Sequence, residues 1–194
     1  MTIWCIGRNY KDHALEMKAE IPTSPLVFIK SGGCLSNQKT ITLPFFSQDV
    51  HHELEIALRL DHKLNFTEVA LALDLTARDI QAELKKKGQP WAMSKSFKGS
   101  CPVSSWIPLQ NQKWFESLQF QLTVNGQVRQ LGKTQDMIFS CQDILEYLKD
   151  YYPLQGGDIV LTGTPEGVGP LKAGDRMKAE ISGHLHWEWE VLNP

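Results

Sequence analysis

The sequence has no apolar run near the roughly 18 residues that a membrane-spanning helix needs. Residues Met1–Arg8 also lack the basic start and the long apolar stretch of a secretory leader. We therefore expect a cytoplasmic protein with no membrane partner.

Cysteine is scarce. The chain has four cysteines, none of them in a Cys-x-x-Cys pair: Cys5, Cys34, Cys101 and Cys141. They are too sparse for a disulfide framework in a chain of this length, and the residues around them show no base paired to activate a nucleophile. We expect free thiols without a catalytic role.

An excess of charge of one sign is also absent. The formal net charge is −2 and the pI is about 6.3, so no strong overall field directs the protein toward nucleic acid. The densest basic run, Lys85–Lys87, is typical of the solvated last turn of a helix, where cations complement the helix dipole. We expect no nucleic-acid partner.

No linker, internal repeat or low-complexity tract divides the sequence. Its 194 residues, 42% hydrophobic and 22% charged, are typical of a globular chain that can bury a core. This indicates one domain spanning residues 1–194.

Strand patterns outnumber helix patterns. Period-2 alternation and short apolar runs predict strands within 26–30, 53–60, 120–124, 158–162 and 184–191. Asn125-Gly126 predicts a hairpin turn. Helices are predicted from Thr76 to Gly88, with Thr76 and Asp79 as a capping box, and within 143–151 and 11–18. The strands do not alternate regularly with helices, so the expected class is α+β, β-dominated, with a few peripheral helices.

The most informative polar cluster is acidic. On a strand, Glu53 and Glu55 share one face while Leu54, Ile56 and Leu58 share the other, which we assign to the core. The two carboxylates form either a solvated strand face or part of a divalent-cation site.

Asp74 ends a further apolar run. It either helps to cap the following helix or converges with Glu53 and Glu55. Three carboxylates, with water and substrate in the other positions, would suit Mg²⁺ or Mn²⁺.

Two other motifs are less specific. The loop Thr162–Gly169 lacks the Gly-Lys-Ser/Thr ending of a phosphate-binding loop. His184 and His186 share a strand face with Glu188, which we interpret as solvated, while Trp187 and Trp189 face the core or an oligomer interface.

The order and content of five motifs resemble the fumarylacetoacetate hydrolase family, in particular its small acylpyruvase and oxaloacetate decarboxylase branch. The motifs are Gly7-Arg8-Asn9-Tyr10-x-x-His13-x-x-Glu16; His51-His52-Glu53-Leu54-Glu55; Leu73-Asp74-Leu75-Thr76-Ala77-Arg78-Asp79-Ile80-Gln81; Lys87-Gly88-x-Pro90-Trp91 with Ser94-Lys95-Ser96-Phe97; and Gly157-Asp158 through Thr162-Gly163-Thr164-Pro165-x-Gly167-x-Gly169. The resemblance implies a mixed β-sandwich roll, a homodimer, and a lid segment at about residues 8–20.

The resemblance also implies a chemistry. Glu53, Glu55 and Asp74 would hold one Mg²⁺ or Mn²⁺, which binds a small-molecule 2-keto acid. Hydrolysis of an acylpyruvate between C3 and C4, or decarboxylation of oxaloacetate, would pass through a metal-stabilised pyruvate enolate. His13 and Glu16, three apart on a lid helix, match a dyad that activates water.

Other positions match residues that line the family's pocket. Lys95 would stabilise the bound keto acid alongside the metal as a catalytic residue. The residues expected to bind substrate are Arg8, Arg78, Gln81 and Thr164. Taken without the resemblance, Lys95 is more simply a surface lysine. Arg78 and Gln81 are equally compatible with exposed helix positions, and Arg8 could equally pin the loop after the first strand.

Two segments depart from the family pattern. The chain between Leu60 and Leu71 is shorter than expected, which puts the support of the cation site in doubt, and Ser31–Cys34 is abbreviated. Two alternatives to a C–C bond hydrolase or lyase therefore remain. One is a 2-keto acid isomerase, tautomerase or hydratase of the same superfamily, and the other is a non-catalytic member.

Overall fold

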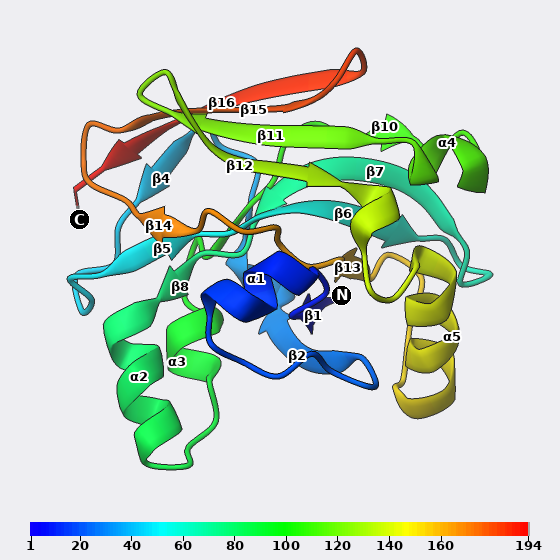
Figure 1. Ribbon diagram of the computed structural model, residues 1–194, viewed down its shortest axis with the longest axis horizontal. Helices are drawn as coiled ribbons and strands as arrows, with labels where there is room; N and C mark the ends of the chain where they lie inside the picture. The colour runs from blue at the N-terminus through cyan, green and yellow to red at the C-terminus, as the bar shows by residue number, and fades with distance from the viewer. Residues whose placement is uncertain (194) are drawn as a thin grey trace.

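The computed structural model describes residues 1–193, which form two larger sheets, two small ones and short helices around them (Figure 1). The six-stranded sheet has the order β10 (Ile107–Pro108), β7 (Phe66–Leu73), β6 (Leu54–Leu60), β13 (Ile159–Leu161), β1 (Thr2–Gly7) and β2 (Leu26–Ser31). The five-stranded sheet has the order β12 (Gln127–Lys133), β11 (Gln119–Val124), β15 (Arg176–Ile181), β16 (Leu185–Leu192) and β4 (Thr40–Thr42). The class is therefore the expected β-dominated α+β.

The smaller elements lie around these sheets. A three-stranded sheet has the order β14 (Gly169–Pro170), β5 (Val50–His52) and β8 (Thr76–Ala77), and β3 (Leu35–Ser36) pairs with β9 (Cys101–Pro102). The helices are α1 (Lys11–Glu16), α2 (Arg78–Lys86), α3 (Ala92–Lys95), α4 (Gln112–Glu116) and α5 (Cys141–Tyr151), with 3₁₀ turns at Gly32–Cys34 and Thr134–Asp136. Within residues 1–193, no helix has the length and hydropathy to cross a bilayer.

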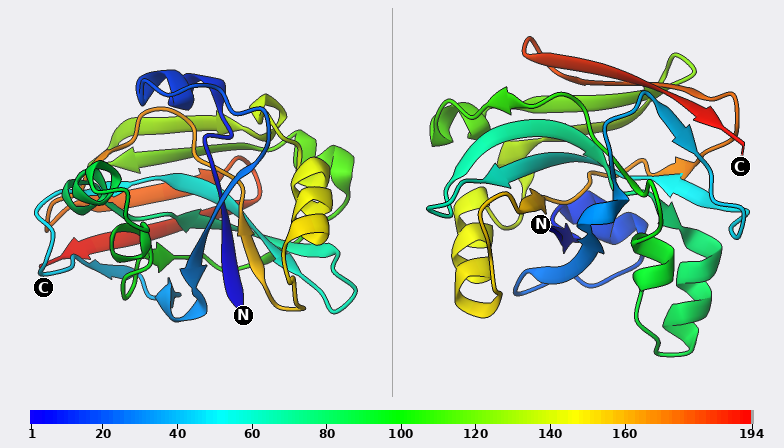
Figure 2. Two further views of the ribbon diagram at one scale, coloured as in Figure 1. Left: turned by 90° about the horizontal axis from the view of Figure 1, so that it is seen from below. Right: turned by 180° about the vertical axis from the view of Figure 1, so that it is seen from behind.

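Strand β6 is buried on both faces. Leu54 and Ile56 pack in the main core, which also holds Phe120 of β11 and Trp189 of β16, so this core lies between the two larger sheets (Figure 2). Ala57 lies in a second cluster on the other face of β6. The leucine and isoleucine side chains therefore face the core as predicted, whereas the interpretation of the opposite face as solvated is wrong.

The predicted start of α2 is also wrong. The helix begins at Arg78 and its cap residue, Ala77, makes no side-chain capping bond. Thr76 instead pairs with His51 across β8 and β5, so it is a strand residue and not a helix cap. Asp79 accepts hydrogen bonds from Ser47 Oγ at 2.6 Å and Gln48 N at 2.9 Å, which ties the helix start to the preceding loop.

Other local predictions agree with the structure. Asn125 and Gly126 both have positive φ, as a tight hairpin turn requires, and join β11 to β12. Trp189 is buried and Trp187 packs against the main core. Helix α1 ends at Glu16, slightly before its predicted end at Lys18.

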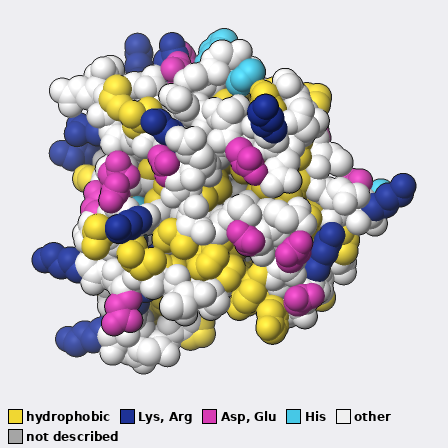
Figure 3. Space-filling view, turned by 45° about the vertical axis from the view of Figure 1, so that its right-hand side comes forward, with side chains coloured by type: hydrophobic (Ala, Val, Ile, Leu, Met, Phe, Trp, Pro, Cys, Tyr) yellow, Lys and Arg dark blue, Asp and Glu magenta, His cyan; other side chains and the backbone are white. Residues whose placement is uncertain are grey.

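The cysteines are free, and three are buried. Burial raises the pKa of Cys101 to about 12 and that of Cys141 to about 11, values that leave the thiols protonated and unreactive. On the surface shown in Figure 3, acidic and basic side chains are interspersed, as expected for a net charge of −2.

Asn9 fastens the segment between β1 and α1 to the rest of the fold. Its side-chain amide donates to the carbonyls of Thr162 at 2.8 Å and Phe139 at 3.1 Å. Its Oδ1 accepts from the Phe139 N–H at 2.8 Å, and the side chain is fully buried. Arg8 and His13, on either side of Asn9, are thereby held beside the end of β13.

We expect Asn9→Ala to lower the free energy of unfolding by about 3 kcal/mol, because the buried Asn9 side chain loses three hydrogen bonds of about 1 kcal/mol each. Urea denaturation measures this change. Gln142→Ala is the control, since Gln142 is exposed and bonds only to Glu146, and it should stay within about 0.5 kcal/mol of wild type. Equal stability of the two variants would contradict the anchoring role of Asn9.

Candidate active site

Three buried carboxylates converge at one end of the β6–β7 hairpin. The register of this hairpin pairs Leu54 with Leu73, which places Glu53 opposite Asp74, and the Asp74 N–H donates to the Glu53 carbonyl at 2.8 Å. Glu55 adds a third carboxylate to the same space. Potential ligand oxygens of the three side chains lie within 4.8 Å of one another.

The short segment between Leu60 and Leu71 leaves this register intact. A tight turn closes the hairpin, with Asp61 N–H donating to the Asn65 carbonyl at 2.9 Å. The register shift at Leu60 lies at the turn end of the hairpin, far along the strands from Glu53. The departure from the family pattern therefore does not separate the three carboxylates.

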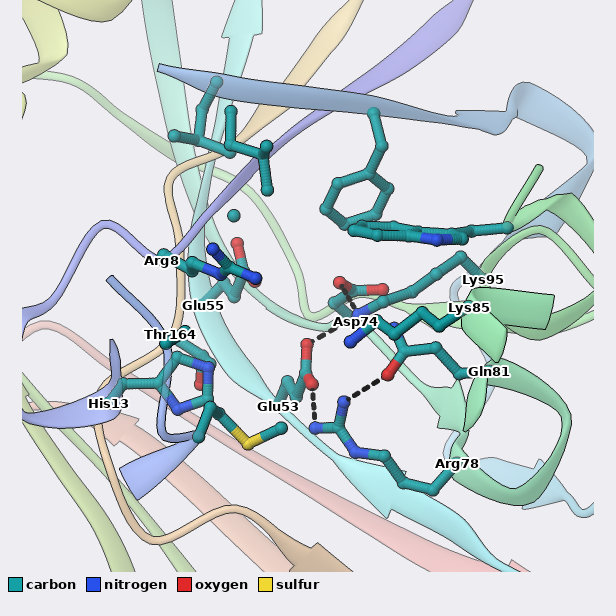
Figure 4. Close-up of a pocket in the computed structure, with 17 residues that line it drawn as sticks. Arg8, His13, Glu53, Glu55, Asp74, Arg78, Gln81, Lys85, Lys95 and Thr164 are labelled. Carbon is teal, nitrogen blue, oxygen red and sulfur yellow. Dashed lines mark hydrogen bonds and ion pairs between the residues drawn. The ribbon is translucent and has the colours of Figure 1, made fainter. Parts of the chain in front are cut away.

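Lys95, from α3, lies between two of the carboxylates. Its Nζ donates to Asp74 Oδ2 at 2.6 Å and to Glu53 Oε2 at 2.7 Å (Figure 4). Burial alone would lower the pKa of Lys95, but Asp74 and Glu53 outweigh it and raise the pKa to about 12. Lys95 is therefore an ammonium ion at neutral pH, suited to stabilise negative charge rather than to accept a proton.

Glu53 and Arg78 form a second ion pair. Arg78 Nη2 donates to Glu53 Oε1, and Arg78 Nη1 donates to Gln81 Oε1 at 2.9 Å (Figure 4). Burial opposes ionisation of Glu53, but Lys95 and Arg78 prevail and hold its pKa below the ordinary carboxyl value. Glu53 is therefore charged across the physiological range.

The negative charge of the Glu55 carboxylate is compensated much less by its neighbours than that of Glu53. Its Oε2 accepts a hydrogen bond from the Gly163 N–H at 2.6 Å. Burial, then the charges of Asp74 and Glu53, raise its pKa well above the ordinary value. A cation placed among the three carboxylates would relieve this repulsion.

Asp74 Oδ1 gives the second indication that a cation fits. It lies 2.8 Å from Lys30 Nζ, yet no donor in residues 1–193 is aligned to make a hydrogen bond to it. The donor set is entirely oxygen, which suits a hard divalent cation such as Mg²⁺ or Mn²⁺. The residues present therefore fit the cation that the sequence predicts.

Lys30 is a buried charge that the sequence analysis did not assign to the site. It is 0% exposed, and its Nζ donates to the carbonyls of Ser100 at 3.1 Å, Leu75 at 3.2 Å and Lys95. These bonds hold the backbone of Lys95 beside Asp74. The alternating pattern of residues 26–30 places Lys30 on the same strand face as Leu26 and Phe28. Such a pattern does not show which groups the lysine contacts.

His13 enters the pocket from α1. Its Nδ1 lies 3.3 Å from Glu16 Oε2, and Glu16 accepts hydrogen bonds from the Gly167 N–H at 3.1 and 3.2 Å. Burial lowers the pKa of His13, although Glu53 and Glu16 act in the opposite direction. The imidazole is therefore neutral near pH 7, with Nδ1–H directed to Glu16 and Nε2 left to accept a proton.

The remaining predicted residues line the same pocket. Arg8, Arg78, Gln81 and Thr164 all border it (Figure 4). Thr164 Oγ1 donates to the Leu54 carbonyl at 2.9 Å and accepts from Gln130 Nε2 at 2.8 Å, so its hydroxyl is held against β6. The pocket also includes Lys85 and Trp91, to which the sequence analysis gave no role in the site.

Comparisons with known proteins show the family of this chain. The family described as fumarylacetoacetate (FAA) hydrolase, C-terminal, matches residues 2–191. The mitochondrial oxaloacetate tautomerase FAHD1 of Bos taurus is 40% identical over 203 residues, covering 99% of this chain and 92% of the relative. The oxaloacetate tautomerase YcgM of Escherichia coli is 38% identical over 192 residues, covering 93% and 88%.

A solved structure matches as well. The fumarylpyruvate hydrolase of Pseudomonas aeruginosa, in complex with Mn²⁺ and pyruvate, superimposes with a TM-score of 0.93 at 28% identity, covering 100% of this chain and 90% of that one. With a family match over nearly all of its residues and relatives near 40% identity, the chain belongs to the fumarylacetoacetate hydrolase family.

Proposed function

We propose that the protein is a Mg²⁺- or Mn²⁺-dependent enzyme that interconverts the keto and enol forms of oxaloacetate. The observation that carries this proposal is the convergence of Glu53, Glu55 and Asp74 in a pocket that also holds the Lys95 ammonium and a neutral His13. Relatives named oxaloacetate tautomerase, and a similar structure in complex with Mn²⁺ and pyruvate, support the choice of substrate and metal.

Glu53, Glu55 and Asp74 would hold the cation. When bound, it supplies a Lewis acid that polarises the 2-keto oxygen of the substrate. Arg8 and Arg78 supply positive charge for the C1 carboxylate, while Gln81 and Thr164 border the same space. The Lys95 ammonium adds a second source of positive charge near the keto oxygen.

His13 is the group suited to move the proton. In the keto-to-enol direction its Nε2 takes a proton from C3, and the electron pair of that C–H bond becomes the C2–C3 double bond as negative charge moves to the C2 oxygen. The bond from His13 Nδ1 to Glu16 orients the ring and stabilises the imidazolium that forms. The C2 oxygen of this enolate then takes a proton from water, which gives the enol. In the opposite direction the enol O–H first loses its proton to water, and His13 returns a proton to C3.

The His13–Glu16 pair favours a second candidate function, cleavage of a C–C bond. On an acylpyruvate, His13 would take a proton from water, and the resulting hydroxide would attack the distal carbonyl. The C3–C4 bond then breaks, with its electron pair passing to the pyruvate enolate. Decarboxylation of oxaloacetate would yield the same enolate without water.

We expect Glu55→Gln to slow tautomerisation of oxaloacetate at least about a hundredfold, because one cation ligand is lost. Loss of the enol absorbance measures the rate, with Mg²⁺ or EDTA present. Glu68→Gln is the control, since Glu68 pairs with Arg59 away from the pocket.

The same variant distinguishes a role of Glu55 in cation binding from a role in the stability of the fold. Because its folded pKa is raised, ionised Glu55 destabilises the metal-free protein as pH rises above the ordinary carboxyl pKa. Glu55→Gln in EDTA should thus melt at or above the wild-type temperature and lose the stabilisation that Mg²⁺ gives the wild type. An unchanged Mg²⁺ effect would exclude Glu55 as a ligand.

His13 predicts the pH dependence of the rate. Its pKa is lowered, so the base is neutral at pH 7, and kcat/KM should fall only as pH drops below about 6.5, the ordinary histidine value. His13→Ala should slow tautomerisation by roughly 10²- to 10⁴-fold and remove this acidic limb. Asp12→Ala, on the exposed side of α1, is the control.

The same variant distinguishes the two candidate functions. Pyruvate release from acetylpyruvate and oxaloacetate is measured in parallel, with Lys95→Ala as the control for decarboxylation by free metal. If His13→Ala loses only cleavage of acetylpyruvate, His13 activates water and is not the base for enolisation.

A further inference from the structure

Lys85 is a cation at the pocket that the proposed reaction does not use. It follows Arg78 and Gln81 on α2 at positions i+7 and i+4, so all three side chains lie on the same helix face. The three border the pocket together, and Figure 4 draws Lys85 on the same side as Gln81 and Lys95. Lys85 therefore belongs to the pocket wall as well as to the last turn of the helix.

The aromatic wall of the pocket lies beside Lys85. Its Nζ is 5.2 Å from the centroid of the Trp91 ring, and the Trp91 and Phe28 ring centroids are 6.0 Å apart. Packing along Trp91 restricts where the ammonium can go. The side chain is exposed, but this contact keeps its ammonium beside the pocket.

Lys85 has no carboxylate partner. Within residues 1–193, Arg78 and Lys95 both form ion pairs with Glu53, whereas no carboxylate oxygen lies within 4.0 Å of Lys85 or Arg8. Partial burial, followed by the charges of Arg78, Arg8 and Lys95, lowers the pKa of Lys85. This part of the pocket therefore has uncompensated positive charge, to which an anion would be attracted.

The neighbouring lysines differ from Lys85. All three lysines are exposed, but Lys87 pairs with Glu83 one turn earlier, and neither Lys86 nor Lys87 borders the pocket. Both occupy the helix end, where any cation complements the dipole. A role that depends on the pocket is thus specific to Lys85, and Lys86 serves as a matched control.

We propose that Lys85 is a specificity-determining residue that binds the distal carboxylate of a dicarboxylic 2-keto acid. This inference rests on the proposed function, in which the 2-keto acid head group lies at Glu53, Glu55 and Asp74. The substrate then spans the pocket, with its head group at the buried carboxylates and its second carboxylate at the exposed Lys85 ammonium. Arg8, the other cation without a partner, remains available to the C1 carboxylate.

Binding of two unreactive hydroxy acids tests the inference independently of turnover. Malate and lactate both chelate divalent cations through a hydroxyl and a carboxylate, but only malate has a distal carboxylate. With Mg²⁺ present, isothermal titration should show that Lys85→Gln weakens malate binding about tenfold, as expected for loss of a charge-assisted contact, and leaves lactate binding unchanged. Lys86→Gln should change neither, and Lys85→Arg should restore the preference for malate.

Turnover supplies the second test. Oxaloacetate and its C4 methyl ester share the 2-keto acid head group, but the ester has no distal charge. Lys85→Gln should raise KM for oxaloacetate about tenfold with little change in kcat, and should leave the kinetics of the ester unaffected. Equal losses on both substrates, or an unchanged preference for malate over lactate, would overturn the role of Lys85. If the wild type turned over neither substrate but Lys85→Gln still lost the malate preference, the proposed reaction would fail while the distal carboxylate site stood.

Discussion

The structure is organised around three carboxylates and three cations that are kept out of water together. Burying a charge is costly unless it is paired and hydrogen-bonded, and here Glu53 and Asp74 meet Lys95, Arg78 and Lys30. The carboxylates come from the β6–β7 hairpin, whereas the cations come from β2, α2 and α3. Elements distant in sequence are therefore held together by the same charges that form the pocket.

Charge balance in this cluster is incomplete, and the imbalance indicates what the pocket binds. Within residues 1–193, Glu55 has a backbone N–H as its hydrogen-bond partner and no ion pair, so the end of the pocket at Glu55 favours a cation. Within the described residues, Arg8 and Lys85 have no carboxylate partner, so the part of the pocket that they border favours an anion. Under the proposed function, a divalent cation together with an anionic 2-keto acid would satisfy both ends at once.

Much of this could be predicted from the sequence, because the decisive signals are local. Alternation gave the strands, Asn125-Gly126 gave the hairpin, and the spacing of Glu53 and Glu55 indicated a shared direction. The start of α2 was mispredicted because Thr76 is paired in a sheet with β5, a tertiary contact that local capping patterns do not report. Lys30 and Lys85 were not assigned to the site because a lysine's contacts depend on which strands and helices surround it.

Formation of a 2-keto acid enolate in this pocket is the step that both candidate functions share. Exchange of the pyruvate methyl hydrogens with D₂O, followed by proton NMR, measures enolisation without any cleavage step. We predict protein-dependent loss of the methyl signal in the presence of Mg²⁺ and none in EDTA. Exchange no faster than with Mg²⁺ alone would contradict this prediction.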